Sequence, residues 1–208
     1  KRFCCLIYLK KFIYLISPKY IDKNFYKNLD KVLSYGNTAF FQLRLKNREK
    51  KKVLSISKKV KQITNRHKVK FILNDNYKLA IKIKADGCHM GQQDGSFKLA
   101  RKSLKGKILG ITCHSSKMLA KKVLSFNPNY IAFGSFYKSK LKPKAIRGNF
   151  EILKWASKNT KKSLVAIGGI NNKNYKKLLR YGAKYIAISS FIWDNPKLEP
   201  ELAIRMFK

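Results

Sequence analysis

The chain reads Phe-Phe-Gln-Leu-Arg-Leu-Lys at residues 40–46, Phe-Ile-Leu-Asn-Asp at residues 71–75 and Val-Ala-Ile-Gly-Gly-Ile-Asn at residues 165–171. In each segment a short apolar run ends in charged, amide or glycine residues. Short apolar runs are typical of buried strands, and the residues that follow parallel strands gather at one end of a barrel. These segments therefore predict a parallel α/β barrel with a functional site at the carboxyl ends of its strands.

The rest of the chain continues the same alternation. Short β-rich runs are separated by segments of helical period, such as residues 50–64 and 116–126, which is typical of repeated βα units. Eight strands are expected, at residues 12–16, 39–43, 69–73, 87–90, 107–112, 130–133, 164–167 and 185–188. An open doubly wound sheet is the alternative, but the Ser-Pro-Lys at residues 17–19 is not the glycine-rich turn that often follows its first strand. We predict an α/β fold with a single (β/α)8 TIM barrel over residues 1–208, and residues 1–11 as a candidate irregular extension.

The charge of the chain is extreme, with 48 Lys and Arg against 10 Asp and Glu and a formal net charge of +38. Such a surface attracts anions, including nucleic acid, anionic lipid and phosphorylated metabolites. The lysines are spread over predicted helix faces, as at residues 50–52 and 121–122, rather than gathered in one patch with aromatic residues. We therefore expect small phosphorylated molecules as partners, with no specific nucleic acid and no membrane. The sequence leaves open whether the protein forms a homo-oligomer.

The expected location is the cytoplasm. The cysteines at positions 4, 5, 88 and 113 have neither the spacing of a zinc site nor that of a disulfide framework. The apolar stretch 3–16 is interrupted by Lys10 and Lys11, so it is too short and too charged to cross a bilayer. A signal peptide is the alternative, but no small-residue cleavage site follows the first apolar run.

Acidic residues are scarce in the middle of the chain, where Asp75, Asp86 and Asp94 are the only ones between residues 50 and 150. Asp75 and Asp94 follow successive predicted strands, so both carboxylates would lie at the same barrel mouth. Mg²⁺ suits such a pair because it binds few carboxylates and completes its shell with water and phosphate oxygens. Arg44 and Lys46 on the neighbouring strand end would then help to stabilise a diphosphate leaving group. The alternative is that the two aspartates cap the helices that follow them.

A second anion site is expected after the last two strands. Gly168 and Gly169 follow the seventh predicted strand, and Ser189 and Ser190 follow the eighth. Barrels of this kind frequently hold a phosphate in these two loops, where backbone amides point inward. Two anion sites imply two phosphorylated substrates.

Several motifs occur in an order that resembles a known family. They are Gln-Leu-Arg-Leu-Lys at 42–46, Asn-Asp at 74–75, Ala-Asp-Gly-Cys-His-Met-Gly-Gln-Gln-Asp at 85–94, Gly-Ile-Thr-Cys-His at 110–114, Phe-Gly-Ser-Phe-Tyr at 133–137 and Ala-Ile-Gly-Gly-Ile at 166–170. By these motifs the chain resembles the thiamine phosphate synthase family from about residue 12 to residue 191.

The resemblance implies a transferase of thiamine biosynthesis that joins hydroxymethylpyrimidine diphosphate to a thiazole phosphate, giving thiamine phosphate and pyrophosphate. It implies Mg²⁺ bound by Asp75 and Asp94, and a thiazole phosphate bound by Ser139, Gly169 and Ser189, with Ser190 beside them. It also implies that the diphosphate is held by Gln42, Arg44, Lys46, Asn74 and Lys142. It further implies that Thr112 binds a leaving oxygen, and the expected catalytic residues are Arg44, Lys142 and Thr112.

The chain departs from the family pattern in places. Leu141 stands where the family has a phosphate-binding hydroxyl, and Ser17 stands where an acidic residue is more usual. The related thiazole tautomerase branch is the nearest alternative, but it tends to lack the paired aspartates and places a histidine where this chain has Ser135. A basic nucleic-acid-binding barrel is the alternative from another class. Three histidines lack zinc-motif spacing, and we expect His67 at the surface and the other two packed or behind the site, namely His89 and His114.

Overall fold

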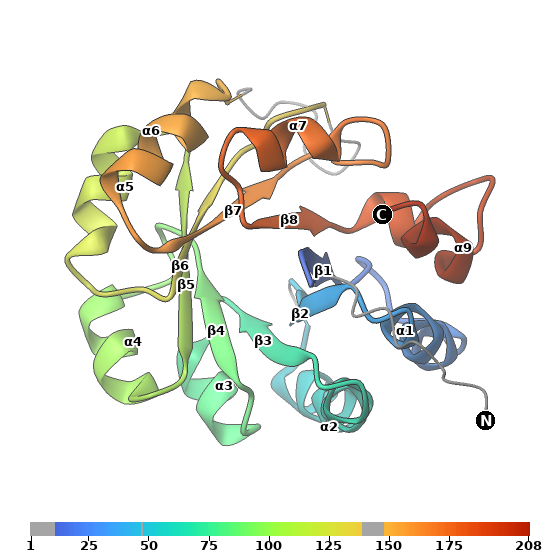
Figure 1. Ribbon diagram of the computed structural model, residues 1–208. Coiled ribbons are helices and arrows are strands. Elements are labelled where there is room, and N and C mark those ends of the chain that lie inside the picture. Colours follow the sequence, from blue (N-terminus) through green and yellow to red (C-terminus); the bar gives the residue numbers. More distant parts are fainter. Residues whose placement is uncertain (1–10, 47, 139–147) are drawn as a thin grey trace, which may run out of the picture.

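The computed structural model describes residues 11–46, 48–138 and 148–208. Parallel strands close into a barrel in which each strand pairs with its neighbour in sequence and the last pairs with the first (Figure 1). The eight strands are β1 (Ile13–Ile16), β2 (Thr38–Leu43), β3 (Lys70–Asn74), β4 (Gly87–Met90), β5 (Ile108–His114), β6 (Tyr130–Phe133), β7 (Ser163–Ile167) and β8 (Tyr185–Ile188).

A helix follows each strand and covers the outside of the barrel (Figure 1). The helices are α1 (Phe25–Ser34), α2 (Lys50–Arg66), α3 (Tyr77–Lys82), α4 (Phe97–Leu104), α5 (Lys117–Leu124), α6 (Glu151–Asn159), α7 (Tyr175–Arg180), α8 (Ser190–Trp193) and α9 (Pro200–Arg205). The predicted (β/α)8 barrel is thereby confirmed, while most of the expected extension at residues 1–11 lies outside the described residues. Within the described part of the chain, every helix is too short or too polar to cross a membrane.

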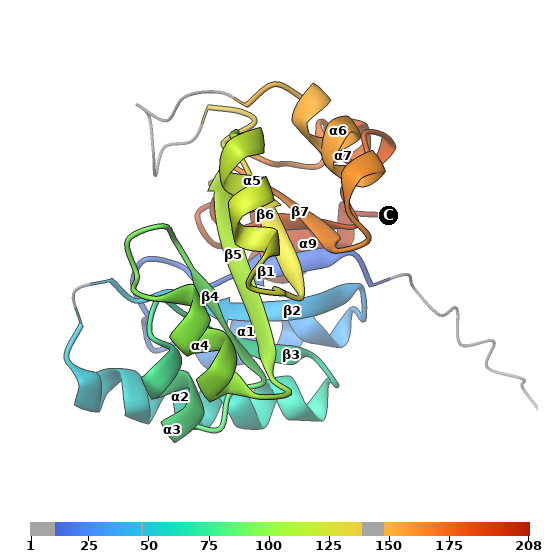
Figure 2. The same cartoon turned by 90° about the vertical axis from the view of Figure 1, so that its left-hand side faces the viewer.

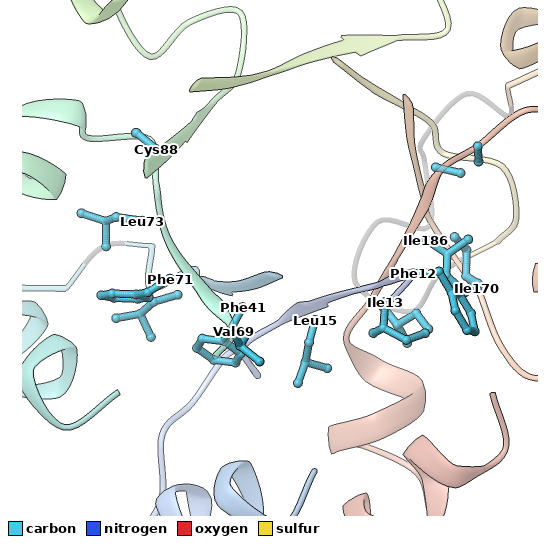
Figure 3. Close-up of a cluster of buried hydrophobic side chains, with 14 of the residues drawn as sticks. Phe12, Ile13, Leu15, Phe41, Val69, Phe71, Leu73, Cys88, Ile170 and Ile186 are labelled. Carbon is cyan, nitrogen blue, oxygen red and sulfur yellow. The ribbon is translucent and has the colours of Figure 1, made fainter. Parts of the chain in front are cut away.

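Alternation along the strands separates two cores, because successive side chains of a strand point to opposite faces. Figure 3 shows Phe41, Phe71 and Leu73 on the outer side of β2 and β3, where they join the large cluster that the helices cover. A smaller cluster fills the barrel itself, and it includes Tyr14 and Tyr130. The inward-facing side chains nearest the carboxyl end of each strand therefore lie at the barrel mouth.

The observed strands agree closely with the expected ones. The bounds of β4, β6 and β8 are those predicted, and β5 runs two residues further than the expected 107–112, to His114. Figure 2 shows that the loops after β2 and β4 lie on the same side of the molecule, as the parallel strand directions require. The predicted site residues at the ends of β2 and β4 thus lie at the same end of the barrel.

Candidate active site

Asp75 and Asp94 meet at the barrel mouth, as the sequence predicts. Asp75 follows β3 with a φ of 67°, and its backbone N–H donates to the carbonyl of His89 on β4 at 2.7 Å. Asp94 lies in the loop after β4, where its Oδ2 accepts the N–H of Gly91 at 2.6 Å. Burial, then a hydrogen bond with Asp94 and the charge of Asp94, raise the pKa of Asp75 to about 6. The two carboxyl groups therefore share one site.

Helix capping, the alternative role for these aspartates, is wrong. The N-cap of α3 is Asn76, whose side chain accepts the N–H of Leu79 at 2.9 Å. The N-cap of α4 is Ser96, whose hydroxyl accepts the N–H of Leu99 at 3.3 Å. Neither aspartate is an N-cap, so neither carboxylate is committed to a helix end.

Asp86, the third acidic residue of this region, has a structural role at the other end of the barrel. It directly precedes β4, and its carboxylate accepts the N–H of Phe71 at 2.9 Å. It also pairs with Lys61 at 3.9 Å and with Lys70 at 3.8 Å. The structure thus separates one structural aspartate from the two at the mouth.

Two cations face the carboxylate pair. The positive charges of Lys46 and Arg44 act on Asp75 and oppose the rise in its pKa. The backbone under Arg44 is fixed by Ser17, whose buried hydroxyl accepts the N–H of Arg44 at 3.0 Å. Ser17 in turn donates its own N–H to the carbonyl of Gln42 at 2.9 Å. Ser17, which stands where an acidic residue is more usual, therefore holds the backbone that carries Arg44.

The carboxylate pair fits a magnesium ion. Among residues 11–46, 48–138 and 148–208, no group of three or more His, Cys, Asp and Glu side chains could hold a metal. Asp75 and Asp94 supply two oxygen-donor groups whose mutual repulsion a divalent cation would relieve. Mg²⁺ commonly uses one or two carboxylates and takes its other ligands from water and substrate phosphate.

Three uncharged polar residues lie near the carboxyl ends of β2, β3 and β5. Asn74 ends β3 and lies beside His89 of β4 in the sheet register. Gln42 donates its side-chain N–H to the hydroxyl of Tyr14 at 2.8 Å. Thr112 places its Oγ1 2.8 Å from Nε2 of His89. All three predicted substrate-binding residues are therefore brought to the same end of the barrel as the aspartates.

The glycine turn after β7 packs against the loop after β6. Gly168 and Gly169 have φ values of 107° and 63°. A Cβ on Gly169 would lie 2.3 Å from the carbonyl oxygen of Lys138, so only glycine allows this approach. Ile167 of β7 is paired with Ala187 of β8, so the turn lies next to the end of β8.

Ser189 follows β8 on this side of the mouth. Its hydroxyl donates to the carbonyl of Ser17 at 3.1 Å, which links the end of β8 to the end of β1. Ser190 is the first residue of α8. The predicted residues Ser139 and Lys142, and the departure at Leu141, lie outside the described residues.

The histidine predictions are partly confirmed. His89 lies behind the site as expected, against Thr112. The prediction for His114 is wrong, because this residue is exposed rather than packed. The prediction that His67 lies at the surface is also wrong. This residue is half-buried, and its Nε2 lies 2.8 Å from Oδ1 of Asp30.

Sequence reasoning missed Tyr14 and Tyr130, which lie inside the barrel between Gln42 and His89. A signal for Tyr130 exists in the sequence, because a glycine occupies the inward position 110 of the adjacent strand. A Cβ on Gly110 would lie 1.9 Å from Cζ of Tyr130. A glycine inside a strand indicates that a large neighbour approaches closely.

Comparison with known proteins gives one consistent result. A family model described as thiamine monophosphate synthase matches residues 13–192. The thiamine-phosphate synthase of Pelagibacter ubique is 52% identical, over 96% of this chain and 97% of that protein. The thiamine-phosphate synthase of Erythrobacter litoralis is 37% identical, over 88% of each chain.

A solved structure agrees with the sequence matches. The thiamine phosphate pyrophosphorylase of Pyrococcus furiosus superposes with a TM-score of 0.83 at 25% identity, covering 94% of this chain and 93% of that one. The motifs in the loops after β2, β3, β4 and β7 lie at one barrel mouth, where the family resemblance requires them. This chain belongs to the thiamine monophosphate synthase family.

Proposed function

We propose that this protein is a transferase that joins hydroxymethylpyrimidine diphosphate to a thiazole phosphate, forming thiamine phosphate and releasing pyrophosphate. The observation that carries the proposal is that the charges of Lys46 and Arg44 act on Asp75, whose carboxyl group is hydrogen-bonded to Asp94. Cations opposite a metal-binding pair match the charge of a leaving diphosphate.

The side chains at the mouth suit a reaction in which the leaving group carries most of the charge. The carbon–oxygen bond to the diphosphate breaks with its electron pair on oxygen, and the thiazole nitrogen forms the new carbon–nitrogen bond. Arg44 and Lys46 would stabilise the negative charge that develops on the diphosphate. Gln42, Asn74 and Thr112 would bind and orient the same substrate, and Lys142 would add a further cation.

Asp75 and Asp94 would hold Mg²⁺. When bound, the ion would neutralise charge on the diphosphate oxygens and help to orient the leaving group. The rise in the pKa of Asp75 supports this assignment, because a carboxylate pair at the mouth is unfavourable without a cation.

The thiazole phosphate would bind on the opposite side of the mouth. Gly169 lies in the turn after β7, and Ser189 and Ser190 follow β8, the strand that pairs with β7. Their backbone amides would bind the phosphate, as the loops after the last two strands frequently do in barrels. Ser139 would complete this site, as the family resemblance implies.

We further propose that the whole chain forms one domain that works in the cytoplasm without a nucleic-acid partner. Cys88 and Cys113 are free thiols, which suits a reducing compartment. The reaction requires only small phosphorylated substrates and the metal.

The test is product formation from hydroxymethylpyrimidine diphosphate and thiazole phosphate, with thiamine phosphate detected by mass, with and without Mg²⁺. Two variants are compared, Asp75→Asn at the mouth and Asp86→Asn at the opposite end of the barrel. We expect magnesium-dependent product in the wild type and in Asp86→Asn, and a loss of at least about 100-fold in Asp75→Asn.

Other results would assign the protein differently. Interconversion of thiazole phosphate isomers without coupling would indicate a tautomerase. Failure of both reactions, together with duplex binding that weakens steeply with salt, would indicate a polyanion-binding barrel. Equal losses in Asp75→Asn and Asp86→Asn would remove the metal assignment.

A further inference from the structure

A chain of hydrogen bonds crosses the inside of the barrel and ends at the mouth. Gln42 of β2 donates to the hydroxyl of Tyr14 on β1 at 2.8 Å, and the Tyr14 hydroxyl lies 2.6 Å from that of Tyr130 on β6. The Tyr130 hydroxyl lies 3.0 Å from Nδ1 of His89 on β4. Nε2 of His89 lies 2.8 Å from Oγ1 of Thr112 on β5. The chain therefore links two predicted substrate-binding residues through three others.

The interior of the barrel is shaped for this chain. Tyr14 and Tyr130 are fully buried, and Gly110 leaves the space that the Tyr130 ring occupies. Burial raises the pKa of both phenols, so both hydroxyls keep their protons. The rings of His89 and Tyr130 are nearly parallel, at 8°. The link between Tyr14 and Tyr130 is thus a hydrogen bond between two neutral hydroxyls held by packing.

The direction of the chain follows from its buried end. An amide nitrogen can only donate, so Gln42 Nε2 uses the Tyr14 oxygen as an acceptor. The proton of Tyr14 needs another acceptor, and among the described residues the Tyr130 hydroxyl is the one within hydrogen-bond distance.

The remaining links then follow in order. Tyr130 donates to Nδ1 of His89, and Nε2 of His89 carries the proton donated to Thr112. The reverse direction, or a doubly protonated His89, would leave the Tyr14 proton buried without an acceptor, which is unfavourable. In the favoured direction the free proton belongs to Thr112, which is only partly buried.

We propose that this hydrogen-bond chain runs in one direction, and that Tyr130 and His89 are positioning residues that keep the hydroxyl proton of Thr112 available at the mouth. The proton would be donated to an anionic oxygen of the substrate. This last step rests on the proposed function, whereas the direction of the chain does not. In the reverse direction the Thr112 hydroxyl would donate its proton to Nε2 of His89, and this proton would not be available to the substrate.

The direction is tested without substrate by nitrogen NMR of the histidine rings, above the ordinary pKa of histidine. The chain has 3 histidines, so His89 can be assigned by comparison with His89→Gln. We expect the proton on Nε2 in the wild type, and a mixture of both tautomers in Tyr130→Phe. The control Tyr185→Phe removes another inward tyrosine, which packs on Phe40, and should leave His89 unchanged. A proton on Nδ1 in the wild type would overturn the proposal.

The positioning role is tested by kinetics. Tyr130→Phe should lower kcat about tenfold, the effect of one hydrogen bond, with KM within about twofold. Tyr185→Phe should leave both constants unchanged. In a Thr112→Val background, Tyr130→Phe should have no further effect, because the group it positions is absent.

The two tests separate the inference from the proposed function. Additive losses in the double variant would show that Tyr130 acts on stability or packing rather than through Thr112. If the protein failed to couple the two substrates at all, the proposed function would fall, while the tautomer of His89 would still decide the direction of the chain.

Discussion

Replacing Asp75 by asparagine should stabilise the metal-free protein, because it removes one of two carboxylates that meet at the barrel mouth. Asparagine keeps the shape of the side chain and removes only its charge. The variant should at the same time lose magnesium-dependent activity. Greater stability with lower activity is the expected pattern for a residue whose charge is held in place for function.

The magnitude follows from the pKa of Asp75, which is about 6 in the folded protein against an ordinary value of 3.8. A shift of about two units corresponds to an upper limit of about 3 kcal/mol. Asp75 is only partly buried, and solvent screens part of this repulsion. We therefore expect the free energy of unfolding to rise by about 1 to 1.5 kcal/mol.

The sign of the pH dependence is also fixed. Between about pH 4 and pH 6 the folded protein keeps a proton on Asp75 that the unfolded chain releases. The contribution of Asp75 to stability therefore falls as the pH rises through this range. Asp75→Asn and the wild type should be equally stable near pH 4, and the full difference in stability should be present above about pH 7.

Urea unfolding in the presence of a chelator measures the difference, with Asp86→Asn as the matched control. Asp86 pairs with Lys61 and Lys70, so its variant should be less stable than the wild type, by about 0.5 kcal/mol. Added Mg²⁺ should then stabilise the wild type and leave Asp75→Asn unchanged. A loss of stability in Asp75→Asn, or a difference independent of pH, would refute the reasoning.

Three further predictions concern other parts of the mouth and barrel. Arg44→Ala should lower kcat/KM about 100-fold, while Lys70→Ala, at the other end of the barrel, should leave it unchanged; equal losses in steady-state assays would contradict the assigned role. Gly110→Ala should cost about 2 kcal/mol in urea unfolding, because its Cβ would lie 1.9 Å from Tyr130; an unchanged midpoint would show that the ring can move. Gly169→Ala should raise KM for thiazole phosphate about tenfold but barely change KM for the diphosphate substrate. Equal effects on the two KM values would show that the thiazole phosphate does not bind at this turn.

The sequence was sufficient to predict the barrel because its signals are local. Each strand is a short apolar run followed by a polar end, and parallel pairing then places those ends together. Asp75 and Asp94 could be predicted as neighbours because β3 and β4 are adjacent in the barrel. The sequence did not decide which residue caps α3 or α4, because Asp, Asn and Ser are all suitable N-cap residues. The backbone after β3 decided that Asn76 caps α3.

The internal hydrogen-bond chain could not be predicted from sequence patterns. Tyr14 and Tyr130 are separated by 116 positions, and nothing local relates them. They meet only because the closed barrel brings inward side chains of β1 and β6 together across its interior. His67 was misjudged for a related reason, since its partner Asp30 comes from a different helix.

The loop after β6 is tied at its start to the end of β7 and the glycine turn, and Gly148 is tied back to that start. The N–H groups of Phe136 and Tyr137 donate to Ile167 and Gly168 at 3.1 and 3.0 Å, and the N–H of Gly148 donates to Ser135 at 2.7 Å. The described chain is therefore held in place on either side of residues 139–147. The entropy of closing a loop changes slowly with its length, so residues added between Tyr137 and Gly148 should cost the fold little stability.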